Sequence, residues 1–283
     1  MQNSSAQKMR DLLTLKGYAP GTCKLYISTL QKLEQYYNRP AEQINTQEVR
    51  DYLLYLHNTR RLGNNTINII VHAFRFFYNF HGTVNDRILR QDLPRCKTHI
   101  KLPDVLSPQE VEDIIVCTYN LKHRTILMLA YSTGLRVAEI VSLKIKDIDS
   151  KRMLLHVRNG KGGKARYVML SPKLLKTLRE YWEFYKPRDW LFPAINTGPN
   201  KPICKAALRH IFSQAKKRVK VTKEGGMHSL RHAFATHLLE SGENIFHIQK
   251  LLGHAKLNTT ARYLRMSAKT LTGIKSPLDN LKL

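Results

Sequence analysis

The stretch His228-Ser-Leu-Arg-His-Ala-Phe-Ala-Thr-His-Leu238 carries more information on fold and function than any other part of this 283-residue chain. At 100° per residue, its first leucine, Phe234 and its last leucine share one face of a helix, which predicts packing against an apolar core. A second face carries two imidazoles, those of His228 and His232, on either side of the guanidinium of Arg231. The pattern therefore predicts a helix that places a cationic cluster at a polar edge of the core.

A zinc site is the first alternative for this helix, because two histidines four residues apart also occur in metalloproteases. That motif needs a glutamate directly after the first histidine, where this chain has Ser229. The guanidinium of Arg231 would also repel a metal ion. We therefore predict no metal site here, and we interpret His237, which lies near the apolar face, as a packing histidine.

Three further segments combine glycine with basic or aromatic residues. They are Thr133-Gly-Leu-Arg-Val-Ala-Glu139, Gly160-Lys-Gly-Gly-Lys164, and Leu252-Gly-His254 with Tyr263 nine residues further on. Each segment alone also has an ordinary explanation. The arginine of the first could lie on the surface, the second could be a solvated β-turn, and the tyrosine after the third is one of thirteen in the chain. The glycine-rich segment is not a phosphate-binding P-loop, because alanine and not serine or threonine follows its last lysine. Only their combination is specific.

In this order and spacing, the segments resemble the tyrosine recombinase or phage integrase family, most closely its Xer-like and transposon-borne integrases. The resemblance covers the Thr-Gly-Leu-Arg-x-x-Glu and His-x-Leu-Arg-His-x-Phe-Ala-Thr-His-Leu motifs, and a Leu-Gly-His nine residues before the tyrosine. It implies a set of catalytic residues with the last as the nucleophile: Arg136, Lys161, His228, Arg231, His254 and Tyr263.

The chemistry that the resemblance implies agrees with these residue types. Attack on a DNA phosphodiester passes through a pentavalent phosphorane, whose extra negative charge two guanidiniums can stabilise by bidentate hydrogen bonds. A phenol with a pKa near ~10 needs cations and a proton acceptor to attack at neutral pH. Lys161, on a hairpin, is the candidate acid for the leaving 5′-oxygen. The resemblance then implies a 3′-phosphotyrosine at Tyr263 and strand rejoining without ATP.

No cluster of acidic residues that could hold Mg²⁺ accompanies these motifs, so we expect no metal and no cofactor. The main interpretation is a site-specific DNA recombinase for integration, excision or resolution. One alternative is a type IB topoisomerase-like enzyme that relaxes DNA with the same side chains. The other is a non-catalytic DNA-binding regulator, although every position of the motifs is filled.

The fold class predicted is mainly α, and the resemblance implies the two domains of a tyrosine recombinase. Residues 1–92 show four amphipathic helices and are predicted to be a helical core-binding domain that contacts DNA. The third of these helices is predicted to start after the capping signature of Asn45 and Thr46 with Glu48. Residues 93–106, with Pro94 and Pro103, are predicted to be the linker. Residues 107–266 are predicted to be a helix-rich α/β catalytic domain with a small β-hairpin between the strands 154–158 and 165–170. Its first helix is predicted to start at a capping box of Ser107 and Glu110, and its last helix is predicted over residues 256–266. The tail 267–283 either packs on its own chain or contacts a neighbouring protomer.

Charge and composition favour a polyanionic partner. Lys and Arg number 47 against 21 Asp and Glu, a surplus of 26 positive charges. Such an excess suits DNA phosphates. The family resemblance implies double-stranded DNA with inverted-repeat sites, bound by a homodimer at each site and by a tetramer in synapsis. No apolar run is long enough to span a membrane, no secretory signal pattern starts the chain, and the four cysteines are scattered. We therefore expect a cytoplasmic, nucleoid-associated protein without a membrane partner.

Overall fold

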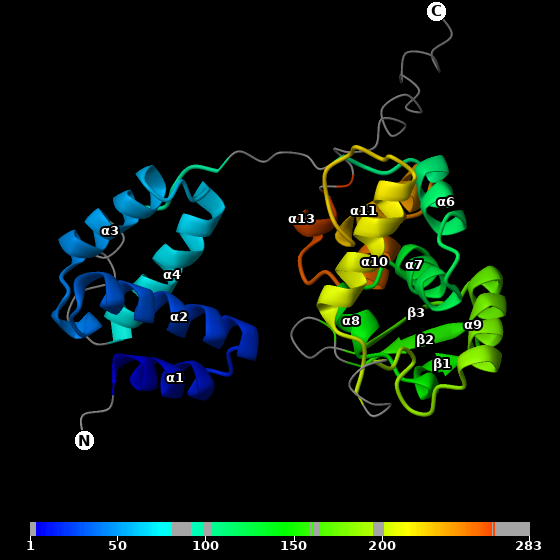
Figure 1. Ribbon diagram of the computed structural model, residues 1–283, viewed down its shortest axis with the longest axis horizontal. Helices are drawn as coiled ribbons and strands as arrows, with labels where there is room; N and C mark the ends of the chain where they lie inside the picture. Colours follow the sequence, from blue (N-terminus) through cyan, green and yellow to red (C-terminus); the bar gives the residue numbers. More distant parts are fainter. Residues whose placement is uncertain are drawn as a thin grey trace, which may run out of the picture. The chain divides into compact units, whose positions relative to one another are not determined.

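The computed structural model describes residues 4–80, 92–98, 104–158, 160, 165–194, 201–261 and 263. The chain divides into two compact units, residues 1–100 and 101–283 (Figure 1). This division falls inside the segment 93–106, which the sequence predicts to be a linker. The predicted tail 267–283 and the hairpin residues 161–164 lie outside the described part of the chain.

The first unit is helical, as its periodic pattern predicts. Its described elements include α1 (Ser5–Leu15), α2 (Pro20–Tyr37), the 3-10 turn η1 (Ala41–Gln43), α3 (Thr46–Asn58) and α4 (Asn64–Phe80). α3 starts where the sequence predicts, because Asn45 and Glu48 form a reciprocal capping box. The core of this unit contains residues from α1, α2, α3 and α4, among them Met9, Leu13, Leu30, Leu33, Phe74 and Phe77.

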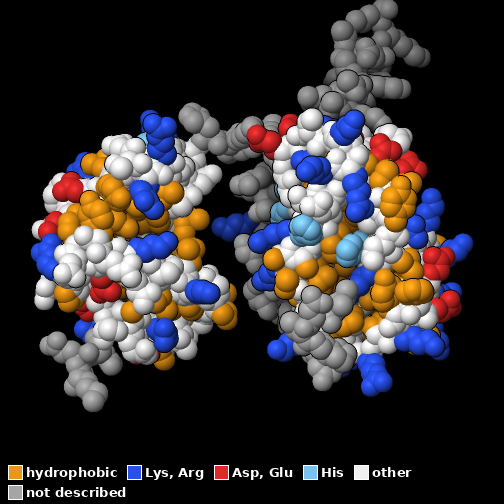
Figure 2. Space-filling model, viewed as in Figure 1, with side chains coloured by type: hydrophobic (Ala, Val, Ile, Leu, Met, Phe, Trp, Pro, Cys, Tyr) orange, Lys and Arg blue, Asp and Glu red, His pale blue; other side chains and the backbone are white. Residues whose placement is uncertain are grey.

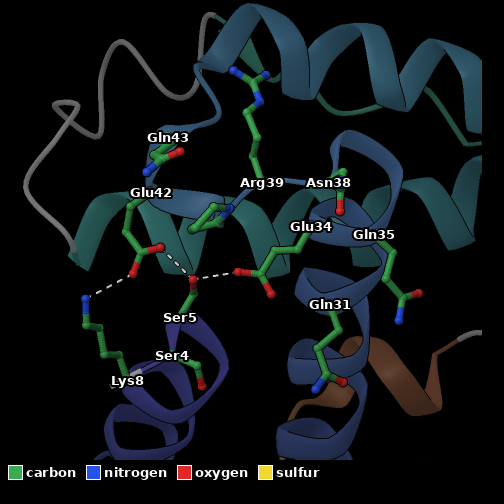
Figure 3. Close-up of a pocket in the computed structure, with 11 residues that line it drawn as sticks. Ser4, Ser5, Lys8, Gln31, Glu34, Gln35, Asn38, Arg39, Glu42 and Gln43 are labelled. Atoms are coloured by element: carbon green, nitrogen blue, oxygen red, sulfur yellow. Dashed lines mark hydrogen bonds and ion pairs between the residues drawn. The ribbon is translucent and has the colours of Figure 1, made fainter. Parts of the chain in front are cut away.

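Polar contacts fix the start of α1 against the rest of the unit. The buried hydroxyl of Ser5 lies 2.6 Å from Glu34 Oε1 and 2.5 Å from Glu42 Oε2, and Lys8 Nζ lies 3.1 Å from the other oxygen of Glu42 (Figure 3). These side chains come from α1, α2 and η1 and line a polar pocket on the surface. The pocket therefore has a structural explanation, because its polar groups hold three elements together.

Residues 92–98 lie along α4 and belong to the first unit. The amide of Asn68 donates from Nδ2 to the carbonyl oxygen of Cys96 at 3.0 Å and accepts from its N–H at 2.8 Å. Arg75 donates from Nε to the carbonyl oxygen of Leu93 at 3.1 Å. Side chains of α4 thus satisfy backbone groups that no regular secondary structure pairs, and they fix the first part of the predicted linker.

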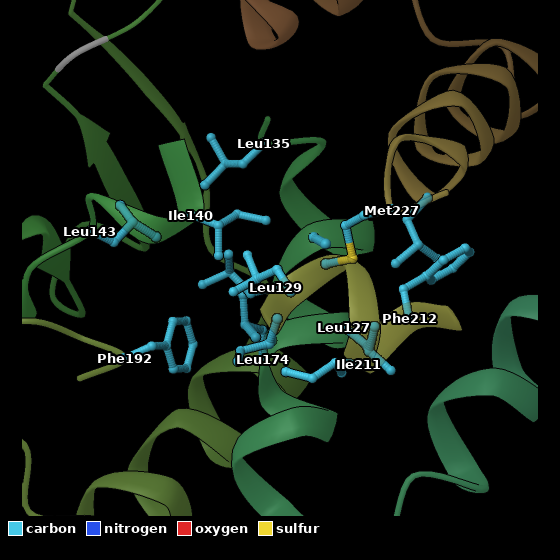
Figure 4. Packing of buried hydrophobic residues seen from close by; sticks show 14 of the residues in the cluster. Leu127, Leu129, Leu135, Ile140, Leu143, Leu174, Phe192, Ile211, Phe212 and Met227 are labelled. Atoms are coloured by element: carbon cyan, nitrogen blue, oxygen red, sulfur yellow. The ribbon is translucent and has the colours of Figure 1, made fainter. Parts of the chain in front are cut away.

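The second unit surrounds a small antiparallel sheet with helices. Its helices are α6 (Pro108–Val116), α7 (Leu121–Thr133), α8 (Val137–Val141), η2 (Ile145–Asp147), α9 (Pro172–Tyr185), α10 (Lys205–Arg218), α11 (His228–Glu240), α12 (Ile245–Leu252) and α13 (Leu257–Thr260). The sheet has the order β1 (Ile148–Asp149), β2 (Leu154–Val157), β3 (Arg166–Met169). Its main core packs α7 against α9, α10 and α11 and includes Leu127, Leu129, Leu174, Ile211, Phe212 and Met227 (Figure 4).

Most described elements of this unit agree with the sequence pattern, and some differ from it. The capping box of Ser107 and Glu110 and the two strands of the hairpin are confirmed. β1 was not predicted, because two residues show no alternation that a pattern could reveal. Of the helix predicted over residues 256–266, the described residues up to 261 contain the single turn α13, which ends three positions before Tyr263. That short turn orients the residue on which the proposed chemistry depends.

Candidate active site

Five of the six predicted catalytic residues are described, and they converge at one end of α11. Lys161 lies outside the described residues. Arg136 is the N-terminal cap of α8, and His228 and Arg231 occupy the first turn of α11. His254 lies two positions after the end of α12, and Tyr263 lies three positions after the end of α13. Figure 2 shows histidine side chains beside lysine and arginine side chains on one face of this unit.

Arg231 is the centre of the cluster and is buried, with 2% of its surface exposed. Its Nη1 donates to the carbonyl oxygen of Gly134 at 2.7 Å, and its Nη2 donates to that of Leu252 at 2.7 Å. The sequence predicted a guanidinium at a polar edge, and the structure places it deeper. The positive charge of this buried guanidinium is nevertheless compensated, because it accepts no hydrogen bonds but donates them to carbonyl oxygens at the ends of α7 and α12, which bear partial negative charge.

Gly134 makes this arrangement possible at the end of α7. It adopts a left-handed conformation with φ +61°, and a Cβ added there would lie 2.4 Å from a ring carbon of Phe234. Glycine is the residue that tolerates both constraints. The tight turn brings its carbonyl to Arg231 and leads the chain within two residues to Arg136.

The hydrogen bonds of His254 fix its tautomer. Arg231 Nη2 lies 3.0 Å from His254 Nε2, and because a guanidinium only donates, that nitrogen accepts. Nδ1 therefore carries the proton and donates to Thr260 Oγ1 at 2.9 Å. Burial, followed by the positive charges of Arg231 and Arg136, lowers the pKa of His254 to about 4. The imidazole is thus neutral at physiological pH.

Glu139 joins the cationic side chains into one network. It is 3% exposed, and its two oxygens lie 2.8 Å from the backbone nitrogen of Arg136 and 2.9 Å from Nη1 of the same residue. Arg166 donates to both oxygens, at 3.0 and 2.9 Å. Burial raises the pKa of the Glu139 carboxyl, but hydrogen bonds from Arg166 and from the backbone of Arg136 outweigh it, so the net pKa is lowered.

Arg166 is a residue that the sequence reasoning missed. Its Nε donates to the carbonyl oxygen of Leu251 at 2.7 Å, so it connects β3 to the end of α12 as well as to Glu139. Gly253 leaves room for it, since a Cβ there would lie 3.1 Å from the Cδ of Arg166. One arginine in a short strand carries no sequence signal, because its partners are 27 and 85 positions away.

Arg166→Ala is expected to lower the free energy of unfolding by about 3 kcal/mol, because truncating one partner of a buried ion pair leaves the other poorly compensated. Urea unfolding followed by circular dichroism measures this change. Arg152→Ala is the matched control: its ion pair with Asp149 is exposed and 3.9 Å long, so we expect a change within about 0.5 kcal/mol. Equal effects of the two substitutions would contradict the role assigned to Arg166.

Tyr263 is held inside this cluster and is 4% exposed. Its hydroxyl lies 3.3 Å from Nδ1 of His232, and its ring stacks on that of His254 at a centroid distance of 6.3 Å and an interplanar angle of 9°. The backbone N–H of Tyr263 closes the turn of α13 by donating to Thr260 at 2.9 Å. The tyrosine and the two histidines therefore form one packed group beside Arg231.

His237, the packing histidine predicted on α11, contacts a tyrosine outside the cluster. Nδ1 of His237 lies 2.9 Å from the hydroxyl of Tyr131, and the two rings meet edge to face. Within the described residues, no three His, Cys, Asp or Glu side chains are grouped so that they could hold a metal ion. What the cluster offers instead is three guanidiniums around one carboxylate, a site that attracts an anion with several oxygens.

Comparison with known proteins identifies the family of this chain. Residues 104–270 match the model of the phage integrase family, and residues 6–81 match that of the phage integrase N-terminal SAM-like domain. The chain belongs to the phage integrase family. Members of this family named tyrosine recombinases are site-specific recombinases, and this integrase is one as well.

Relatives support the assignment over nearly the whole chain. A protein of Sinorhizobium fredii with "integrase/recombinase" in its name is 39% identical over 275 residues, which are 97% of this chain and 88% of that one. The tyrosine recombinase XerA of Pyrococcus horikoshii is 33% identical over 263 residues, 92% of this chain and 88% of that one.

Solved structures show that the integrase has the fold predicted for it. A lambda integrase tetramer bound to a Holliday junction matches with a TM-score of 0.75, at 18% identity, over 98% of this chain and 80% of that one. In the part of this integrase that the structure describes, no helix has the length and apolar character needed to cross a membrane.

Proposed function

We propose that this recombinase cleaves and rejoins DNA strands through a 3′-phosphotyrosyl intermediate on Tyr263, without a metal ion or ATP. The observation that carries the proposal is the position of the Tyr263 hydroxyl inside a cluster of neutral imidazoles and guanidiniums. Such a cluster can stabilise the charge that develops on a phosphate during attack. In many enzymes this electrostatic stabilisation is the largest single contribution to the rate enhancement.

Each predicted residue receives a role in this proposal. Arg136 and Arg231 bind the two non-bridging oxygens of the phosphate, on which charge accumulates. The hydrogen bonds of Arg231 to the carbonyl oxygens of Gly134 and Leu252 hold its guanidinium in place for that task. His228 is exposed and can reach the phosphate from the surface, whereas His254 orients both Arg231 and the tyrosine ring.

The reaction is a simple exchange of one ester for another. The hydroxyl oxygen of Tyr263 bonds to phosphorus, the bond from phosphorus to the 5′-oxygen breaks, and that oxygen takes a proton from Lys161. The energy of the phosphodiester is retained in the phosphotyrosine, so the 5′-hydroxyl of another strand can reverse the step. This explains recombination without an external energy source.

We further propose a separate role for each of the two units. Residues 1–92 are a core-binding domain and residues 107–266 the catalytic domain, and both contact double-stranded DNA whose inverted repeats bind one protomer each. A dimer on each site and a tetramer in synapsis are supported by the fold match to lambda integrase, which forms a tetramer on a Holliday junction. The net charge of +26 supports the DNA contact.

Covalent attachment to DNA is expected to proceed at an unchanged rate in excess EDTA, because guanidiniums and not metal ions carry the charge stabilisation. The probe is a duplex with the inverted repeats of the recombination site, which are first sought in the DNA that flanks the gene. A nick in this duplex traps the covalent complex. The complex is measured on a denaturing gel. Loss of the complex on chelation with recovery on adding Mg²⁺ would contradict the proposal.

A further inference from the structure

His232 is a residue of the site to which no role has been given above. It lies on α11 directly after Arg231, and its Nδ1 is 3.3 Å from the hydroxyl oxygen of Tyr263. Its ring meets the ring of His228 edge to face, with centroids 5.5 Å apart. Among the described histidines, it is the one whose ring nitrogen reaches the hydroxyl of the tyrosine.

The other imidazoles are placed for different tasks. Both nitrogens of His254 are engaged, Nε2 as acceptor from Arg231 and Nδ1 as donor to Thr260, so its ring has no lone pair directed at Tyr263. His237 has a tyrosine hydroxyl on its Nδ1, but that hydroxyl belongs to Tyr131. The geometry thus singles out one histidine as the partner of the nucleophile.

The charges around His232 keep its ring neutral. His228 and Arg231 face it from its own helix, Tyr263 from the turn after α13, and His254 from the end of α12. Burial, followed by electrostatic repulsion from His228 and Arg231, lowers the pKa of His232 to about 4. A neutral imidazole with the proton on Nε2 leaves the lone pair of Nδ1 free to accept the phenolic hydrogen.

We propose that His232 is the general base that accepts the hydroxyl proton of Tyr263 during attack. This inference rests on the proposed function, because it assigns the proton of that reaction. As the bond from oxygen to phosphorus forms, the proton on the tyrosine oxygen passes to Nδ1, and the 5′-oxygen leaves with a proton from Lys161. In the reverse step His232 returns the proton to the tyrosine, so no outside acid or base is consumed.

The test compares two matched substitutions on the same helix. In His232→Asn the side-chain amide oxygen lies near the former position of Nδ1, so it still accepts a hydrogen bond but has no basicity. His237→Asn makes the same change at a histidine whose Nδ1 also contacts a tyrosine hydroxyl, one outside the site. Single-turnover formation of the covalent complex is measured on the nicked inverted-repeat duplex between pH 7 and 9.

We expect His232→Asn to slow the reaction by about 10²- to 10⁴-fold at pH 7, the usual contribution of a general base. Its remaining rate is expected to rise about tenfold per pH unit, because hydroxide must then ionise the tyrosine. The wild type and His237→Asn are expected to lack that rise. A merely structural role would lower the rate equally at each pH.

The outcomes separate this inference from the proposed function. If the wild type forms a covalent complex and His232→Asn matches its rate, or is slower with the same pH profile, the base is another group. If the wild type forms no covalent complex, both the function and this inference fail. Binding of the same duplex in a mobility-shift assay shows that the variant folds. If His232→Asn does not bind, His232→Gln takes its place, and the same rise with pH is required of it.

Discussion

Tyr263→Phe is expected to abolish the covalent protein–DNA complex while leaving DNA affinity nearly unchanged. The phenyl ring can still stack on His254 and pack among its apolar neighbours Phe234 and Leu252, while the contact of the hydroxyl to His232 is removed. The attacking oxygen, however, is gone, so no covalent bond to the DNA phosphate can form at this position. A denaturing gel of the nicked inverted-repeat duplex shows the loss, and a mobility-shift assay shows that binding persists.

The control for this prediction is a tyrosine with the same local chemistry elsewhere. Tyr131→Phe removes a hydroxyl that is 2.9 Å from His237, and we expect it to keep the covalent complex. A covalent band that persists with Tyr263→Phe would show that another residue attacks the DNA. A band lost equally with Tyr131→Phe would show that the assay reports stability and not chemistry.

Substitution of Arg231 is expected to produce the second large effect, a loss of about 10³- to 10⁵-fold in cleavage rate, the range known for arginines that stabilise phosphoryl transfer. Arg231→Lys is preferable to alanine, because alanine would also leave two buried carbonyls without donors. Lysine keeps the charge but lacks the planar fork that binds two oxygens at once. DNA affinity is expected to change only severalfold, since the contribution lies mainly in the transition state.

A sulfur-substituted substrate separates this role from that of the acid. When sulfur replaces the leaving 5′-oxygen, a thiolate leaves without protonation, so Lys161→Ala is expected to regain the wild-type rate. Arg231→Lys is expected to stay slow, because the charge on the non-bridging oxygens still needs the guanidinium. Equal rescue of both variants would refute the division of roles. If Lys161→Ala stays slow on this substrate, the general acid must be another residue, and Lys164 is the first to test.

Local signals explain which parts of the structure the sequence predicted. The capping boxes at Asn45 and Ser107 set the starts of α3 and α6, since their partners lie three residues away. The two faces of α11 follow from helical periodicity, and the apolar face with Leu230 and Phe234 is buried as expected. Residue order and spacing also identified the segments that meet at the site.

Long-range pairing explains what the sequence did not predict. A helical wheel places Arg231 at a polar edge, whereas the structure buries it, because the carbonyls that accept its hydrogen bonds lie 97 and 21 positions away. The contact of His232 with Tyr263 spans 31 positions, and nothing within α11 distinguishes that histidine from His237. Glu139 was noted only as a member of its motif, and its bonds to Arg166 depend on how β3 packs.

The position of Tyr263 has a consequence for how strand breakage is controlled. The tyrosine lies beside Arg231 and His254 of its own polypeptide, so a single protomer brings nucleophile and charge-stabilising groups together without borrowing from a neighbour. In a tetramer of such protomers, a shortage of nucleophiles cannot prevent simultaneous cuts in both strands of a duplex. Double-strand breaks would then be avoided only if some protomers stay inactive until their neighbours have rejoined the DNA strands that they cut.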